Sequence, residues 1–146
     1  LLLAGGALFA SGNHAEAQVQ FEKFNREYVG NPLTPQAKLG LAACLLAQGK
    51  TDDAARAYKD LADRFPNANT APQARFALGG IYESQGKLED ALNLFEQVAR
   101  AEQNSSMGSE AGMRAEEIRL KLPPIPMPVT PTPAAAVSTN AAPVVK

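Results

Sequence analysis

The fold is decided by residues 49–61, GKTDDAARAYKDL, because their pattern occurs three times along the chain. Residues 12–24, GNHAEAQVQFEKF, and residues 86–98, GKLEDALNLFEQV, repeat it at a constant spacing of 37 residues. Every copy begins with glycine, has alanine five positions later and has an aromatic residue nine positions later. Self-similarity at a fixed period of this size indicates a stack of small, equivalent units.

Each unit is predicted to be two helices joined by a tight turn. The glycine ends the first helix, because it adopts the left-handed conformation without a Cβ penalty. Small residues seven positions before it let the two helices approach closely, and apolar residues stand four positions before it. These residues are Gly5, Ala42 and Gly79, and Leu8, Leu45 and Tyr82. In the second helix, Ala54, Tyr58, Leu61 and Phe65 form one apolar face at helical spacing.

Prolines mark where the units meet. Pro66 follows Phe65 and ends a second helix, since proline disfavours helical geometry in the residue before it. Pro35 and Pro72 are expected near the start of the next first helices, where a missing N–H costs nothing. The same phase reaches Ser109, which is predicted to cap the N-terminus of a final helix over residues 107–122.

The final helix is predicted to close the stack. One of its faces is apolar, with Ala111, Ala115, Ile118 and Leu122, whereas Glu116 and Arg119 replace the small and apolar residues of the earlier units. A terminal repeat needs a polar outer face to stop the stack from propagating, so this helix is interpreted as a C-terminal cap.

The two ends of the chain are open to more than one interpretation. Residues 1–10, LLLAGGALFA, are predicted to be the first helix of the first unit; the alternative is a remnant of a secretory signal, although ten residues cannot span a bilayer. The absence of an initial Met suggests a longer chain upstream. Residues 123–146 hold seven of the eleven prolines and no aromatic residue. They are predicted to be a disordered tail, either a flexible terminus or a proline-rich ligand for a partner.

The repeated residues resemble the tetratricopeptide repeat (TPR) family: a small residue, then Leu or an aromatic residue, then Gly in the first helix, and Ala, an aromatic residue and an apolar residue in the second. The resemblance covers residues 1–122 and implies an all-α, right-handed α-solenoid of about three helix hairpins with a C-terminal capping helix. The expected repeats span residues 1–30, 34–66 and 71–103.

The 37-residue unit is longer than most TPR units and resembles the repeats of bacterial envelope proteins. These are the outer-membrane assembly lipoprotein and the Tol–Pal-associated coordinator of cell division. That resemblance implies a scaffold in the periplasm or at the inner membrane, held by an N-terminal anchor that this sequence does not contain. A cytoplasmic location is the alternative.

In TPR stacks the first helices line a concave groove that binds extended peptides or partner helices. The resemblance therefore implies a mostly apolar groove for a protein with an apolar segment or an amphipathic helix. Its residues would be Leu2, Gly6, Phe9, Ala10, Gln36, Leu39, Ala43, Leu46, Ala47, Gln73, Phe76, Gly80, Glu83 and Ser84. The alternative is a groove filled by its own side chains or by a missing upstream helix.

No catalytic, cofactor-binding or metal-binding residues are predicted. Cys44 and His14 are the only residues of their kinds and lie on different repeats, and Cys44 falls in an apolar run typical of a core. Gly49-Lys50-Thr51 imitates the end of a phosphate-binding loop but lacks its first glycine and its strand. A net charge of −1 with both signs interspersed argues against nucleic-acid binding.

Three functions remain at this point. The first is a non-catalytic protein-binding scaffold. The second is a structural module that self-associates through its apolar N-terminal edge and forms a homo-oligomer. The third, an enzyme or the accessory domain of a larger assembly, is disfavoured because no catalytic constellation is present.

Overall fold

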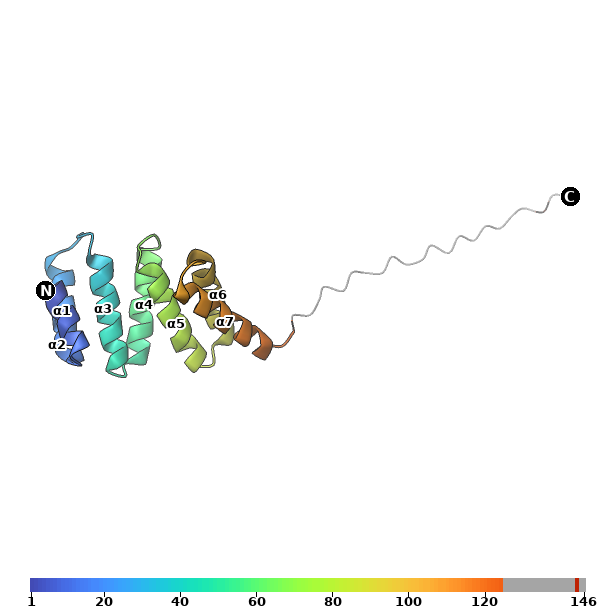
Figure 1. The fold of residues 1–146 in the computed structure, drawn as a ribbon, viewed down its shortest axis with the longest axis horizontal. Coiled ribbons are helices and arrows are strands. Elements are labelled where there is room, and N and C mark those ends of the chain that lie inside the picture. Colours follow the sequence, from blue (N-terminus) through green and yellow to red (C-terminus); the bar gives the residue numbers. More distant parts are fainter. Residues whose placement is uncertain (125–143, 145–146) are drawn as a thin grey trace.

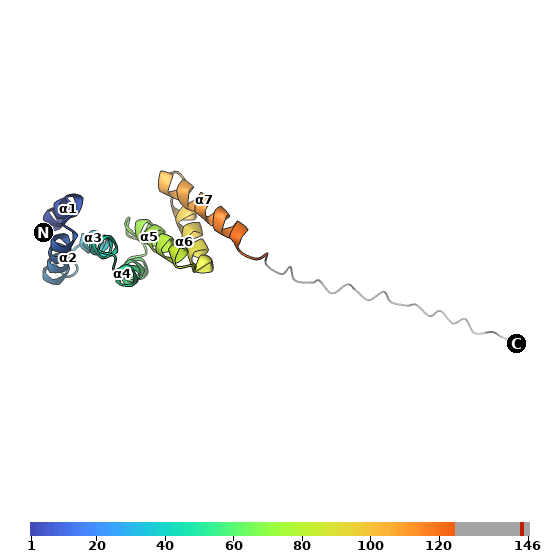
Figure 2. The same cartoon turned by 90° about the horizontal axis from the view of Figure 1, so that it is seen from below.

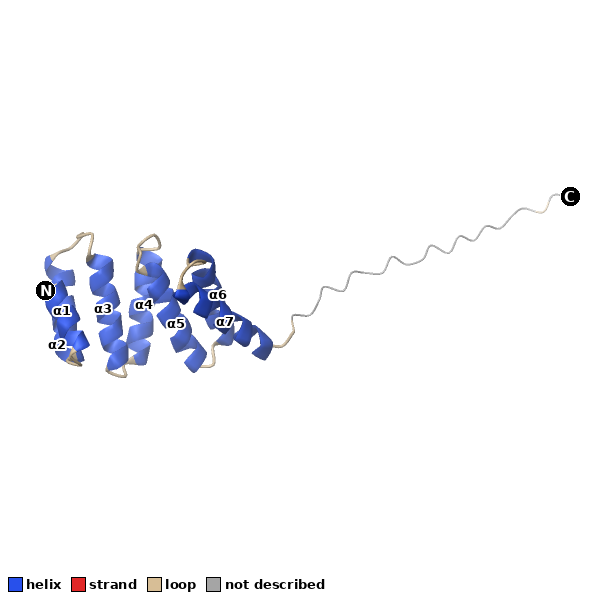
Figure 3. Ribbon diagram, in the orientation of Figure 1, coloured by secondary structure: helices blue, strands red, loops and turns tan. Residues whose placement is uncertain are grey.

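The computed structural model describes residues 1–124 and residue 144. Within this part of the chain it contains seven α-helices and no strand (Figures 1 and 3). The helices are α1 (Leu2–Ala10), α2 (His14–Glu27), α3 (Thr34–Ala47), α4 (Thr51–Arg64), α5 (Ala71–Ser84), α6 (Leu88–Ala101) and α7 (Ser106–Lys121). The predicted fold class, a solenoid of three helix hairpins followed by a single helix, is confirmed. Most of the predicted tail lies outside the described residues.

The turns inside the hairpins are built as the repeat predicts. Gly12, Gly49 and Gly86 have positive φ angles of 85°, 74° and 73°. In this conformation the residue after each glycine donates its backbone N–H to the carbonyl five residues before it, as Lys50 does to Leu45 at 2.9 Å. The three turns therefore end α1, α3 and α5 in the same way.

The helix starts agree with the proline positions, with one exception. Pro35 and Pro72 lie in the first turns of α3 and α5. The prediction that Ser109 caps the last helix is wrong: α7 begins at Ser106, and the Ser105 hydroxyl accepts a hydrogen bond from the Gly108 N–H at 3.0 Å. Ser109 occupies the repeat position of Pro72 but, unlike proline, has a backbone N–H. This N–H donates to the Ser105 carbonyl at 3.0 Å, so the helix begins about one turn earlier.

The core runs along the stack as three clusters, one centred on each hairpin junction. The central cluster contains Tyr58 and Leu61 of α4 with Leu78 and Ile81 of α5. The N-terminal cluster contains Phe21 and Phe24 of α2 with Ala37 and Cys44 of α3, and a third cluster joins α6 to α7. Cys44 is fully buried in the N-terminal cluster, as expected of a small core residue.

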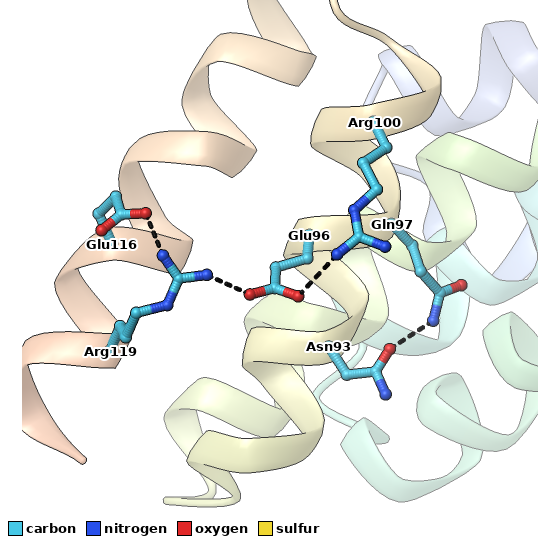
Figure 4. A network of polar contacts seen from close by, with 6 residues as sticks. All are labelled: Asn93, Glu96, Gln97, Arg100, Glu116 and Arg119. Carbon is cyan, nitrogen blue, oxygen red and sulfur yellow. Dashed lines mark hydrogen bonds and ion pairs between the residues drawn. The ribbon is translucent and has the colours of Figure 1, made fainter. Parts of the chain in front are cut away.

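The last helix is fixed to α6 by charges as well as by apolar packing. Arg119 pairs with Glu116 on its own helix and with Glu96 on α6, and Glu96 also pairs with Arg100 (Figure 4). Ala111, Ala115 and Ile118 are buried in one apolar cluster with residues of α6. None of the seven helices is both long and apolar enough to cross a membrane.

Candidate functional site

The stack is curved, and the first helix of each unit lies on its inner side. In Figure 2 the odd-numbered helices α1, α3, α5 and α7 follow the upper edge of the arc, and α2, α4 and α6 follow the lower edge. All the groove residues expected from the sequence are on α1, α3 and α5. We call the surface formed by these residues and their equivalents on α7 the inner face.

The inner face is apolar but only partly exposed over the first three units. Phe9, Leu39 and Phe76 are half-buried, and Leu46 is 37% exposed. Phe76 also packs edge-on against Phe95 of α6, with ring centroids 5.5 Å apart. The predicted groove residues therefore contribute to the core as well as to the surface, and Phe76 is the clearest case.

Apart from half-buried Leu2, the remaining predicted groove residues are small or polar. Gln36, Ala43 and Gly80 are half-buried and Gln73 is exposed. Gln36 donates a hydrogen bond of 3.3 Å from its side-chain amide to Asn69 in the linker before α5. This contact ties the start of α3 to the next unit.

At its C-terminal end the inner face carries a guanidinium that the sequence-based groove lacked. Arg114 of α7 lies over the ring of Phe76, with its Cζ 5.3 Å from the centroid, and its Nη1 is 3.6 Å from a carboxylate oxygen of Glu83. A Cβ on Gly80 would lie 3.8 Å from the same nitrogen. Arg114, which is not among the groove residues expected from the sequence, therefore contacts or approaches three of them.

Two apolar residues of α7 also belong to the inner face and were missed. Adding one repeat length to Phe76 and Glu83 gives Met113 and Leu120, which are 67% and 87% exposed. They were overlooked because α7 was interpreted only as a cap with a charged outer side. The constant repeat length would have identified them.

Cys44 and His14, the only residues of their kinds in the sequence, are both packed against neighbouring side chains. Burial raises the pKa of the Cys44 thiol, which makes its reactive thiolate scarcer. The His14 ring packs against Phe9 at 4.9 Å. Glu117 is paired with Lys121 at 2.8 Å, and that hydrogen bond lowers the pKa of its carboxyl group. In the described part of the chain, no three His, Cys, Asp or Glu side chains are grouped to hold a metal ion.

Comparison with known sequences gives one family. The sequence profile described as tetratricopeptide repeat matches residues 2–69 and residues 45–106. No curated protein matches the chain significantly in sequence.

Several solved structures share the fold. PcrH from Pseudomonas aeruginosa superimposes with a TM-score of 0.70 at 20% identity, covering 81% of this chain and 88% of PcrH. PcrH in complex with the chaperone binding region of PopD gives 0.68 at 22% identity, with 82% and 90% covered. A T3SS complex from Aeromonas hydrophila gives 0.69 at 23% identity, with 82% and 78% covered.

Proposed function

Since the chain belongs to the tetratricopeptide repeat family, we propose that it is a non-catalytic scaffold that binds a protein segment on its inner face. The observation that carries this proposal is the row of exposed apolar side chains on that face. Leu46, Met113 and Leu120 are 37%, 67% and 87% exposed, and they lie on α3 and α7. Exposed apolar residues that share one surface are typical of a binding site.

The chemistry of the inner face favours an apolar segment or an amphipathic helix as the partner. Half-buried Leu39 and Phe76 continue the row between the exposed residues. Arg114 and Glu83 place one charge of each sign at its C-terminal end. The complex of PcrH with the chaperone binding region of PopD supports the proposal, since it shows a similar fold bound to a segment of another protein.

The proposal is tested by replacing exposed residues of the inner face, which leaves the core intact. Peptides that bind the wild-type chain are first selected from a displayed random library, and their affinities are measured by calorimetry. The double variant Leu46→Asp, Met113→Asp should bind them at least about tenfold more weakly, because each carboxylate would have to be desolvated in the complex. Val19→Asp is the matched control, since Val19 is 56% exposed and lies on α2.

Two outcomes contradict the proposal. Selection could enrich no peptide over the background, or the enriched peptides could bind the inner-face variant as tightly as the wild type. Retained helical circular dichroism in each variant confirms that the loss is one of binding and not of folding.

We also propose that the scaffold works in the bacterial envelope. The support is the 37-residue unit, which resembles the repeats of envelope proteins. Fractionation of cells that express the tagged protein from its own gene is the test. Recovery with the periplasm or inner membrane is expected, and recovery with cytoplasmic proteins would contradict the assignment.

Self-association is the second candidate, and one observation favours it. Leu3 is 90% exposed and Ala4 and Ala7 are also exposed, whereas Leu78 and Ile81, which occupy the positions of Ala4 and Ala7 two repeats later, are buried. Sedimentation of the wild type should then show a dimer that Leu3→Asp dissociates. Leu120→Asp is the control, because Leu120 is equally exposed on the last helix. A monomer at high concentration would eliminate this candidate.

A further inference from the structure

A cavity of about 420 Å³ opens between α4 and α6, over α5, and it shares no residue with the inner face. Its floor is apolar: Ala62 and Leu78 are buried, and Leu94 and Tyr82 are half-buried. Its rim carries charged and amide side chains from all three helices. They are Lys59, Asp63, Arg75, Asp90, Asn93 and Gln97.

The equivalent positions one repeat earlier hold two closed ion pairs. Lys38 of α3 lies 3.0 Å from Asp60 of α4, and Arg56 pairs with Asp53 within α4. These pairs span the positions that correspond, 37 residues later, to the rim of the cavity. In the hairpin of α3 and α4, these four charged side chains are therefore paired with one another.

In the hairpin of the cavity each of these pairs has lost one member. Arg75 replaces Lys38, but Gln97 stands where Asp60 supplied the carboxylate. Asp90 replaces Asp53, but Asn93 stands where Arg56 supplied the cation. The cation of the first pair and the carboxylate of the second pair are kept, whereas the charged partner of each is replaced by an amide side chain.

The result is one unpaired charge of each sign on the rim. Within residues 1–124, neither Arg75 nor Asp90 has an oppositely charged group within 4.0 Å. The amides of Asn93 and Gln97 hydrogen-bond to each other at 2.7 Å (Figure 4). Lys59 is already paired with Asp63 at 2.5 Å. Arg75 and Asp90 are thus available to a ligand.

The two charges lie toward opposite ends of the cavity. Gln97 marks the end that corresponds to the Lys38–Asp60 pair, and Asp90 is seven residues before it on α6. At 1.5 Å per helical residue the separation along the helix axis is about 10 Å. An extended chain covers the same distance in about three residues.

We propose that this cavity is a second peptide-binding site, which takes a short extended segment with an acidic and a basic side chain three positions apart. The carboxylate pairs with Arg75 and the cation pairs with Asp90. An apolar side chain between them lies on the floor formed by Leu78 and Leu94. The site is separate from the inner face, so the scaffold can hold two segments at once.

The test uses the full chain and two probes, acetyl-Glu-Leu-Ala-Lys-amide and the reversed acetyl-Lys-Ala-Leu-Glu-amide, because the direction of the segment is open. Binding is followed by nuclear magnetic resonance through the Arg75 side-chain signal and the backbone amides of α5 and α6. One of the two probes should shift these signals in a saturable manner. The uncharged acetyl-Gln-Leu-Ala-Gln-amide should bind about tenfold more weakly, which is about what one ion pair on half-buried Arg75 and one on exposed Asp90 supply together.

The sequence of the earlier hairpin provides a variant that closes the site without unfolding the protein. Asn93→Arg with Gln97→Asp restores both internal pairs. The variant should therefore keep the midpoint of thermal unfolding of the wild type and bind the charged probe about tenfold more weakly. Gln103→Asp with Asn104→Arg introduces the same charges on exposed residues of the linker before α7 and should leave binding unchanged.

Three results would overturn the proposal. The first is that no signal of α5 or α6 moves with either probe. The second is equal binding of the charged and uncharged peptides. The third is unchanged binding to the variant with the two restored ion pairs.

Discussion

The ring of Phe21 lies between two glycines that belong to different units. A Cβ built on Gly5 of the same hairpin would be 2.8 Å from this ring, and one built on Gly40 of the next hairpin would be 2.5 Å from it. Phe21 is only 4% exposed, so its ring is enclosed by its neighbours. Glycine at these helical positions is therefore required by packing, against the usual preference for alanine.

The Gly40→Ala variant tests this contact against helix propensity. Alanine normally stabilises a helix interior by roughly 0.5–1 kcal/mol relative to glycine. Overpacking against a fixed ring costs typically about 1–3 kcal/mol, so the variant should be less stable by about 1–2 kcal/mol in urea unfolding. Gly6→Ala is the control, because its Cβ meets nothing within 4 Å, and it should raise stability. A gain of stability in both variants would show that the contact of Gly40 with Phe21 is loose.

Tyr58 makes the stability of the stack sensitive to alkali. Burial, helped by the nearby Cys44, raises the pKa of Tyr58 to about 12. A tyrosine in the unfolded chain loses its proton near pH 10, at about its ordinary pKa. The unfolded state therefore releases this proton first, so the stability is kept below pH 10 and is lost between about pH 10 and pH 12. Tyr58→Phe should flatten the fall of the unfolding free energy over this window, and an unchanged slope would mean that the hydroxyl is solvated.

The start of α7 is decided by a side-chain cap and not by the repeat phase. Ser105→Ala removes the acceptor of the Gly108 N–H and should cost about 1 kcal/mol in thermal or urea unfolding. Ser109→Ala removes only a hydroxyl that donates to the Ser105 carbonyl at 3.2 Å inside the helix, and it should change stability by less than half as much. The opposite ranking would place the cap at Ser109 after all.

This contrast shows how far an element can be predicted from the repeat. The turns at Gly49 and Gly86, and the buried aromatic residues that follow them, recur because each interior hairpin has the same neighbours. The last helix has a neighbour on one side only, so its remaining residues follow other rules. Arg114 could not be placed over Phe76 from the sequence, since its counterparts Gly40 and Ala77 are too short to reach so far. The inner-face residue Met113, by contrast, follows from the phase alone.

On the scale of the whole molecule, the stack is held together by contacts between consecutive helices. Every helix packs mainly against the helix before it and the helix after it, and α1 with α3 is the main additional contact. The central cluster joins α3, α4 and α5, and the C-terminal cluster joins α6 and α7. Stability in such a stack is close to a sum of unit and interface terms, so the same loss of packing has different consequences in the middle and at an end.

Leu61→Ala and Ile118→Ala separate these two consequences, because both side chains are fully buried and each change should cost about 2–5 kcal/mol locally. Leu61 lies in the central cluster, so its loss should lower amide hydrogen-exchange protection in all of α2 to α6. Ile118 lies at the end, so its loss should free α7 and weaken α6 while α2 to α4 keep their protection. A uniform loss of protection in both variants would mean that the chain unfolds as one cooperative unit. The sum of neighbouring interfaces would then be the wrong description of its stability.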